Sequence, residues 1–537
     1  MDKDCEIELK LAIDSVDAAA FRRLPLLREN SLDGPTRRKV FNAYFDTPDL
    51  LLKQNAMALR LRKIGGKWLQ TLKTAGTATG GLHHRGEWEY PLHAPQLDLS
   101  LFRDTPLAAL ANSKQLHLTL MPAFTTVFNR TTWRVETAPG QQVEVALDQG
   151  VIRCGDSEAS ISEVEIELLE GSAAAVFDIA TALATQIALR PENLSKAERG
   201  YRLFWPEPRV ARRADATALK RKWTSQQALQ SIVSSCLAHY VANVDGALNS
   251  DAPEYIHQLR VAMRRLRSAI RTFKPANAEA ISMEVKWLAD ALGDARDWDV
   301  LLMDNLPVLL DGFGDPSLAK ALMATGRQRQ AEGRRFARAA LASPRATLLV
   351  LAIARWAAIP GELTLLPAYG AAAANTADAP AMKLSQFASQ GIRRRHRRLL
   401  KDSATLAELT PEARHQVRID AKRLRYAVDF FSSLFSKTRV ERYEKILGRM
   451  QDLLGETNDD VIAMTHIESL APPERFVDFA RGWFAARTLA NLAGMDPLIA
   501  DLNDAKRFWG KNHEPPPATG SAELKTEQGK QQEPVCK

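Results

Sequence analysis

The chain has 537 residues, of which 45% are hydrophobic and 25% charged, and a formal net charge of +8. The composition is ordinary for a soluble globular protein. The length argues against a single domain, because single cores usually stop growing near about 250–300 residues. The excess of cations favours an anionic partner, either nucleic acid or another polyanion, without choosing between them.

Neither a signal peptide nor a membrane span is predicted. The N-terminus, MDKDCEIELK, is charged at once, and the most apolar stretch, TLLVLAIARWAAIP, is interrupted by Arg355. That stretch is shorter than the roughly 18 residues that a span needs. The four cysteines are scattered without CxxC spacing, which fits a reducing compartment and argues against a zinc or disulfide framework. We therefore expect a cytoplasmic protein that does not contact membrane.

Residues 1–205 have the pattern of many short strands with a few helices. Segments such as VFNAYFDTP, GEWEYPL and EVEIELLEG alternate or carry β-branched and aromatic residues, and turn signals such as GG and PGQ separate them. AAAVFDIATALATQIAL and SKAERGYRLF are typical of helices.

The strands of this region carry charge on one face. In EIELK, Glu6, Glu8 and Lys10 share a face opposite Ile7 and Leu9. The same habit recurs in four further strands, with the aligned charges Arg60 and Arg62; Arg85, Glu87 and Glu89; Glu144 and Asp148; Glu163, Glu165 and Glu167. One such strand fits the wet face of an antiparallel sheet. Several together favour a closed barrel with a charged lumen, because clustered carboxylates on a solvated face only repel each other.

The charge pattern suggests a ligand. Carboxylates supply the hard oxygen ligands that Mg²⁺ prefers, while arginine and lysine bind the oxygens of a polyphosphate. A lumen with both groups fits a metal-bound, highly charged anion.

The ordered set of charged motifs in residues 1–205 resembles the CYTH domain, the triphosphate tunnel metalloenzyme fold. The resemblance rests on the motifs Glu6-x-Glu8-x-Lys10, Arg60-x-Arg62 and Glu165-x-Glu167 and on the later segment SKAERGY. The resemblance implies an antiparallel barrel tunnel that binds triphosphate and divalent metal, Mg²⁺ with Mn²⁺ as the alternative. On this resemblance both faces of each strand are buried, the charged one toward the tunnel.

The resemblance assigns roles to individual residues. The expected metal ligands are Glu6, Glu8, Asp148, Glu163, Glu165 and Glu167. The expected substrate-binding residues are Lys10, Arg60, Arg62, Lys73, Arg85, Arg130, Lys196 and Arg199. The expected catalytic residues are Lys10, Lys196 and Glu89. For Lys73 and Arg130 an ordinary surface position is an equal alternative. We expect in-line attack of water on a terminal phosphorus while the lumen cations stabilise the developing charge.

The second half is predicted to be helical. A basic, proline-flanked linker over 206–223 precedes a helical domain over 224–510 with Thr224 as its N-cap, and a disordered tail follows over 511–537. The helical half contains a repeat, because EYIHQLRVAMRRLRSAIRTF matches EARHQVRIDAKRLRYAVDFF and places His257 over His415 at an offset of 158. ALGDARDWDV and LLGETNDDVI match at an offset of 162.

Each copy of the repeat carries a cationic stripe beside its apolar one. The stripes consist of His257, Arg260, Arg264 and Arg267 in the first copy and His415, Arg418, Lys422 and Arg425 in the second. A solvated basic face is the simpler interpretation. These stripes, however, lack the alternating signs that solvated helices use for i, i+4 pairing.

The duplicated unit resembles the CHAD domain, which commonly follows CYTH. The resemblance implies two pseudo-symmetric helical bundles with a basic central groove and affinity for inorganic polyphosphate, the two stripes being the expected binding residues. The fold class is thus an α+β chain, with an antiparallel β-barrel tunnel followed by an all-α duplicated helical bundle. The predicted function is metal-dependent hydrolysis of inorganic triphosphate to pyrophosphate and phosphate, with inorganic triphosphate and polyphosphate as partners and no nucleic acid.

Three alternatives remain open at this point. One is a polyphosphate-binding or granule-associated protein whose tunnel is vestigial. The second is a tunnel enzyme for an organic triphosphate, such as an adenylate cyclase or a thiamine-triphosphatase. Nucleic-acid binding is the third.

Overall fold

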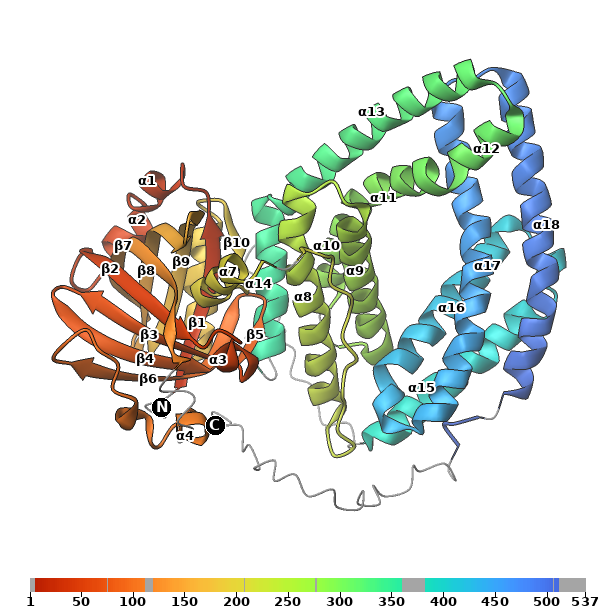
Figure 1. Ribbon diagram of the computed structural model, residues 1–537. Coiled ribbons are helices and arrows are strands. Elements are labelled where there is room, and N and C mark those ends of the chain that lie inside the picture. Colours follow the sequence, from red (N-terminus) through yellow and green to blue (C-terminus); the bar gives the residue numbers. More distant parts are fainter. Residues whose placement is uncertain are drawn as a thin grey trace. The chain divides into compact units, whose positions relative to one another are not determined.

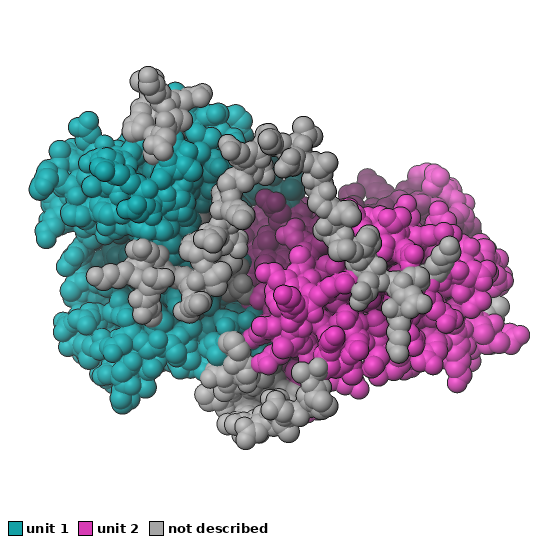
Figure 2. Space-filling view, turned by 90° about the horizontal axis from the view of Figure 1, so that it is seen from below, with its two compact units in different colours: residues 1–210, 342–368, 527–537 teal, residues 211–341, 369–526 magenta. Residues whose placement is uncertain are grey.

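The computed structural model describes residues 5–74, 76–111, 119–206, 208–275, 278–359, 382–505 and 507–510. They form two compact units, coloured separately in Figure 2. The first contains the described residues up to Val210 together with residues 342–359, and the second contains the rest. The tail predicted over 511–537 lies outside the described residues.

The first unit is built on a closed, eight-stranded antiparallel barrel, which confirms the predicted fold (Figure 1). The strands follow the order β1-β9-β8-β7-β2-β3-β4-β6, and pairing of β6 with β1 closes the barrel. Two short strands pair with barrel strands, β5 with β6 and β10 with β1. The strands are β1 (Cys5–Ile13), β2 (Thr36–Asp46), β3 (Met57–Ile64), β4 (Lys67–Thr74), β5 (Thr77–Thr79), β6 (Leu82–Leu92), β7 (Met121–Ala138), β8 (Gln141–Cys154), β9 (Ser157–Glu170) and β10 (Leu189–Pro191).

Both faces of the first strand are buried, as the period-two pattern combined with closure requires. Leu9 and Leu11 are 0% exposed on one face, while Glu8 and Lys10 on the other are each 2% exposed. In the register of β1 and β9, Lys10 lies opposite Glu165. The charged face is therefore the inner one.

Short helices surround the barrel. They are α1 (Ala18–Phe21), α2 (Pro25–Glu29), α3 (Leu51–Gln54), a 3₁₀ turn (Leu99–Phe102), α4 (Ala108–Ala111), α6 (Ala173–Ala184) and α7 (Lys196–Phe204). The two helices predicted from sequence in this region correspond to α6 and α7.

One helix of the barrel unit comes from far along the chain. The helix α14 (Pro344–Ala358) packs against α6 and β10. The Thr347 hydroxyl donates to the carbonyl oxygen of Leu189 on β10, and Arg355 pairs with Asp178 on α6. This helix lies within the range 224–510 that the sequence assigned to the helical domain, yet these contacts are with the barrel.

All the regular secondary structure described in the second unit is helical. Its helices are α8 (Ser225–Asn249), α9 (Pro253–Phe273), α10 (Glu279–Ala291), α11 (Gly293–Val300), a π-helical turn (Leu301–Asn305), α12 (Leu306–Phe313), α13 (Pro316–Leu341), α15 (Leu384–Ser403), α16 (Pro411–Phe431), α17 (Lys437–Ser469) and α18 (Glu474–Asp504), with 3₁₀ turns at Leu406–Glu408 and Ser432–Leu434. Thr224 is the N-cap of α8, and Gln227 completes a capping box. Helices α9 and α16 each have 21 residues and begin at prolines 158 residues apart, in line with the repeat.

The segment predicted as a linker has no helix or strand over 208–223. From residue 211 on it belongs to the second unit. The Arg212 amide donates to Asn243 over 2.9 Å, and the Leu219 amide donates to the Ser433 hydroxyl over 2.9 Å. The C-terminal part of this segment is therefore fixed on the helices.

Among the described helices, none is by itself long and apolar enough to cross a membrane. The adjacent, bent pair α13 and α14 meets the length and composition requirement only when the two are counted together.

Candidate active site

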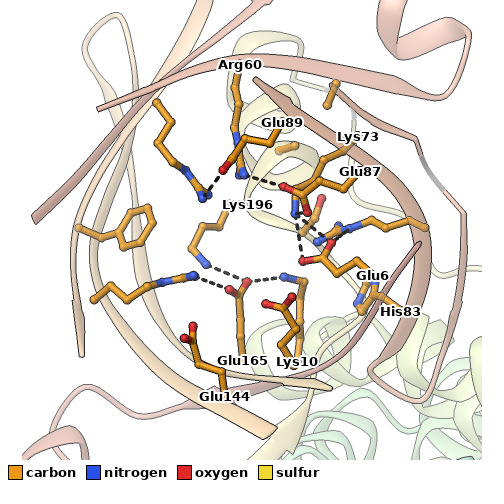
Figure 3. A pocket seen from close by; sticks show the side chains of 18 of the residues that line it. Glu6, Lys10, Arg60, Lys73, His83, Glu87, Glu89, Glu144, Glu165 and Lys196 are labelled. Carbon is orange, nitrogen blue, oxygen red and sulfur yellow. Dashed lines mark hydrogen bonds and ion pairs between the residues drawn. The ribbon is translucent and has the colours of Figure 1, made fainter. Parts of the chain in front are cut away.

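The barrel encloses a cavity of about 1080 Å³ whose wall is charged on all sides (Figure 3). Many of the residues singled out from the sequence line it: Glu6, Lys10, Arg60, Arg62, Lys73, Arg85, Glu89, Arg130, Glu165, Glu167 and Lys196. The remaining ones lie behind this surface as ion-pair partners, namely Glu8, Asp148, Glu163 and Arg199. The structure thus gathers the whole predicted tunnel set around one cavity.

Helix α7 delivers Lys196 to the lumen. A capping box fixes where the helix begins, because the Ser195 hydroxyl accepts from the Glu198 amide at 3.1 Å and Glu198 Oε2 accepts from the Ser195 amide at 2.7 Å. Gly200 lets the helix approach the barrel, since a Cβ there would lie 2.0 Å from the ring of Phe124. The SKAERGY motif therefore fixes the position of α7 against the barrel and also supplies cations.

A second contact docks the same helix. The Tyr201 hydroxyl donates to Asp46 Oδ2 over 2.8 Å, and the Tyr201 ring meets the Phe124 ring edge-on at 5.2 Å. Asp46 also accepts from the amides of Leu52 and Lys53 at the start of α3. One carboxylate thus ties two helices to the end of β2.

Three buried carboxylates lie on the neighbouring strands β8 and β9. One oxygen from each lies within 4.8 Å of the others in the group Asp148, Glu163 and Glu165. Hard oxygen ligands at this spacing fit a divalent cation such as Mg²⁺. Within the described parts of the chain, this is the one group of carboxylate, histidine or cysteine ligands close enough to share an ion. Glu6, Glu8 and Glu167, also predicted as metal ligands, are not part of it.

Lys196 occupies the centre of this cluster. Its Nζ lies 2.6 Å from Asp148 Oδ2 and 3.0 Å from Glu165 Oε1, and it also pairs with Glu163. Burial alone would lower the pKa of Lys196, but the three carboxylates outweigh it and raise the pKa. The amine is therefore protonated at neutral pH and offsets repulsion within the cluster.

Arg130 reaches the cluster from β7. It binds Asp148 in bidentate fashion, with Nε–Oδ1 and Nη2–Oδ2 distances of 2.8 and 2.7 Å, and it also pairs with Glu165. The Phe128 ring lies 5.0 Å from the Lys196 ammonium and 5.7 Å from the Arg130 guanidinium. An aromatic face thus supports both cations.

Lys10 joins the cluster to the first strand. Its ammonium lies 3.0 Å from Glu8 and also pairs with Glu165. Burial would lower its pKa, but Glu165 and Glu8 raise it above the usual value. Lys10 is thus a permanent positive charge in the lumen.

The opposite wall carries a second set of ion pairs. The pairs are Lys73 with Glu6 at 3.0 Å and with Glu87, Arg85 with Glu6 at 2.9 Å and with Glu8, Arg60 with Glu87 at 3.1 Å, and Arg62 with Glu89 at 3.8 Å. Burial and then the neighbouring Arg60 lower the pKa of Arg62 to about 10. Arg62 still carries its charge at neutral pH.

Two lumen carboxylates have no side-chain partner among the described residues. Glu144 and Glu167 lie opposite each other in the register of β8 and β9, and neither side chain makes a hydrogen bond or ion pair with another described residue. Figure 3 shows Glu144 pointing inward near Glu165. Burial, and next the charge of Glu6, raises the pKa of Glu167 to about 8.

Sequence reasoning assigned no role to several further residues of the lining, among them Tyr44, His83, Glu87 and Glu144. Alternation places Glu87 beside Glu89 and Glu144 beside Asp148 on charged strand faces, but the family motifs gave neither glutamate a role. Tyr44 and His83 carry no charge signal. Burial and then Lys10 lower the pKa of His83 to about 4, which leaves a neutral imidazole in a charged wall.

In the second unit, the two cationic stripes meet where α9 packs on α16. The two copies repeat one ion pair, because Arg260 lies 3.9 Å from Asp297 and its counterpart Arg418 lies 3.6 Å from Asp459. The next position of each stripe, Arg264 in one and Lys422 in the other, has no ion pair with any described residue.

The histidines and last cations of the stripes differ between the copies. Burial and then Arg296 lower the pKa of His257 to about 4, so this ring is neutral. His415 Nδ1 instead lies 2.9 Å from Asn458 Oδ1. Arg425 donates to Gln451 over 2.8 Å, and no hydrogen bond or ion pair joins the Arg267 side chain to another described residue.

Comparisons with known protein families agree with both units. The model of the CYTH domain matches residues 4–201, and the model of the CHAD domain matches residues 231–468. The chain combines a CYTH domain with a CHAD domain. The family resemblances read from the charged motifs and from the repeat are thereby confirmed.

Individual relatives match different parts of this CYTH–CHAD chain. An inorganic triphosphatase of Haemophilus influenzae is 37% identical over 207 residues, which cover 37% of this chain and 54% of that protein, so the match spans about half of the relative. An uncharacterized protein of Mycobacterium tuberculosis is 26% identical over 453 residues, 79% of this chain and 80% of that protein. The crystal structure of the CHAD domain from Ricinus communis covers 56% of this chain and 99% of its own, with 31% identity and a TM-score of 0.47.

Proposed function

We propose that the CYTH barrel hydrolyses inorganic triphosphate to pyrophosphate and phosphate with a divalent metal ion, Mg²⁺ or Mn²⁺. The observation that carries the proposal is the lumen itself, where a buried carboxylate triad is surrounded by permanent cations from several strands and from α7. The resemblance of this part of the chain to a protein named inorganic triphosphatase supports it.

The carboxylate triad and the cations would have different roles in the reaction. Asp148, Glu163 and Glu165 would hold the metal ion, which when bound neutralises phosphate oxygens and polarises the bond to be broken. Lys10, Lys196 and Arg130 would then bind phosphate oxygens in place of the carboxylates that they pair with here.

The opposite wall completes the proposed substrate site. Four cations of this wall would hold the far end of the triphosphate: Arg60, Arg62, Lys73 and Arg85. Arg199 pairs with Glu163 and would act through that carboxylate. Glu89, 3.8 Å from Arg62, is the carboxylate that we assign to orienting the attacking water. Charge spreading over the transferred group is stabilised by cations that are already in position, so little reorganisation is needed during the reaction.

The test is phosphate release by the purified chain with Mg²⁺, compared among tripolyphosphate, ATP, thiamine triphosphate and long-chain polyphosphate. Release from tripolyphosphate alone supports the proposal. Faster turnover of ATP or thiamine triphosphate would replace it with a tunnel enzyme for an organic triphosphate. No release from any of them, with binding retained, would leave a vestigial tunnel in a polyphosphate-binding protein.

We further propose that the CHAD unit binds inorganic polyphosphate. The supporting observation is that α9 packs on α16 and brings together Arg264 and Lys422, which have no ion pair with any described residue. A linear polyanion without bases fits such a track, whereas nucleic-acid binding would call for stacking aromatics among the cations. Competition of RNA against polyphosphate at matched salt distinguishes the two, and polyphosphate is expected to win.

A further inference from the structure

The two copies of the CHAD repeat differ at one buried cationic position. Arg264 on α9 corresponds to Lys422 on α16 at the repeat offset of 158. Both side chains are partly buried, and neither forms a hydrogen bond or ion pair with any residue that the structure describes. One copy thus carries a guanidinium where the other carries an amine.

The surroundings of Lys422 are strongly positive. The charged groups that face it are Arg418 on its own helix, Arg260 and Arg264 on α9, and Asp459 on α17. Asp459 is the one carboxylate among them, and it lies 3.6 Å from Arg418. A second carboxylate, Asp297 on α11, lies 3.9 Å from Arg260. Three arginines and the amine therefore face two carboxylates, and the cluster carries a net positive charge.

Such positive surroundings affect the protonation of an arginine and of a lysine differently. Burial, then Arg418 and then Arg264, lower the pKa of Lys422 to about 7. The ordinary pKa of a guanidinium is more than two units higher than that of an amine. Lys422 is therefore the group of this cluster that can change its charge near neutral pH.

We propose that Lys422 takes up a proton when a polyanion binds to the CHAD unit, so that polyphosphate binding is coupled to pH through this one amine. The inference rests on the proposed polyphosphate binding and assigns a regulation to that site. A bound phosphate chain brings negative charge among the same arginines, which reverses the repulsion and favours the ammonium form. Binding then carries a proton from solvent to the Lys422 nitrogen.

The sign of the effect follows from linkage. Below about pH 7 the amine is already protonated, and binding takes up no proton there. Above it the free protein has lost the proton and the complex regains it, so affinity falls as pH rises, by up to about tenfold per pH unit. Long-chain polyphosphate is the suitable probe, because only its two terminal groups titrate in this range.

The experiment is calorimetric titration of the full chain with long-chain polyphosphate at pH 6.0 and pH 8.0, without divalent metal so that no hydrolysis occurs. Titrations at each pH in two buffers of different ionisation enthalpy give the number of protons taken up. We expect uptake approaching about one proton at pH 8.0 and much less at pH 6.0. In Lys422→Arg the uptake disappears, and affinity at pH 8.0 rises up to about tenfold above the wild type.

Lys437→Arg is the matched control, because Lys437 has a side chain that is 90% exposed and lies outside the stripe. It should keep the wild-type uptake. Binding without proton uptake in the wild type, or uptake that persists in Lys422→Arg, overturns the inference and leaves polyphosphate binding standing. No binding by the wild type at either pH overturns the proposed polyphosphate function itself. The two failures are therefore distinguishable.

Discussion

Lys196 Nζ lies 3.0 Å from Glu165 Oε1, although the first residue begins a helix outside the barrel and the second lies on an inner strand face. The lumen is therefore not completed by the strands alone. Its central cation depends on how closely α7 docks, and that docking depends in part on Gly200, Phe124 and Asp46, which do not line the cavity.

Gly200→Ala tests this dependence. The added Cβ would lie 2.0 Å from the Phe124 ring, so helix and ring cannot both keep their places. We expect a loss of about 1–3 kcal/mol in the free energy of unfolding, as for other overpacked sites. We also expect phosphate release to fall by about tenfold or more, because a misplacement near 1 Å is costly in a preorganised site. Urea unfolding and turnover of tripolyphosphate measure the two effects.

Gly448→Ala is the control for the glycine substitution itself. Gly448 lies inside α17 and has nothing within 4 Å of an added Cβ, so alanine should be neutral or slightly stabilising there. If Gly200→Ala behaved like Gly448→Ala in both measurements, α7 would not position Lys196 in the way described.

Glu165→Gln tests the carboxylate triad. The amide keeps the shape of the side chain but removes the charge that faces Lys10, Lys196 and Arg130. We expect metal-dependent turnover to fall by about 10²-fold or more, since a charged group aimed at the reacting centre is lost. Metal affinity, measured by calorimetry in the presence of a non-hydrolysable triphosphate analogue, should weaken in parallel.

Glu158→Gln provides the comparison for that change. Glu158 is on the same strand but half exposed, paired with Arg153 outside the lumen, and a surface pair of this kind contributes little. Turnover close to wild type is expected. Unchanged activity in Glu165→Gln would remove this residue from the metal assignment.

Much of this site could be predicted from local patterns. Alternation in EIELK placed Glu8 and Lys10 on one face, and the number of such strands indicated closure into a barrel. The sequence could not show which carboxylates approach one another. The close group joins Asp148 to Glu163 and Glu165, a pairing set by the register of β8 and β9 rather than by spacing along either strand.

The position of α14 was also beyond local reasoning. Its apolar segment fits a buried helix in either unit, and only contacts across a long stretch of chain place it on the barrel. The hydroxyl of Thr347 and the carbonyl of Leu189 are 158 residues apart in sequence. A periodic sequence pattern does not show which residue, so far away in the chain, a helix will contact.

Charge reversal of Arg260 and Arg418 together to glutamate tests the CHAD surface. These equivalent residues stand beside Arg264 and Lys422, so reversal replaces two attractive charges with two repulsive ones. Polyphosphate affinity should fall by about tenfold or more and depend less steeply on salt, because fewer counterions are released on binding. Titration at several salt concentrations gives both quantities.

The same reversal at Arg329 and Arg475, which are exposed on α13 and α18, changes the net charge equally away from the stripes. Their double variant should bind nearly as the wild type does. Equal losses in the two double variants would mean that net charge alone, and not the paired stripes, attracts the polyanion.

A fragment of residues 1–210 tests whether the CYTH barrel is complete without α14. In the fragment, α6 and β10 lose the helix that covers them, and the buried carbonyl of Leu189 loses its hydroxyl donor. Water can solvate this carbonyl once α14 is gone, so the cost comes mainly from the apolar surface of α6 and β10 that the fragment exposes. Because β10 pairs with β1 at Leu11, next to Lys10, the loosening would reach the lumen wall. We expect the fragment to unfold at lower urea concentration than the barrel in the full chain and to turn over tripolyphosphate more slowly. Addition of a peptide covering residues 342–359 should restore part of both, whereas a fragment as stable and active as the full chain would show that the barrel does not need this helix.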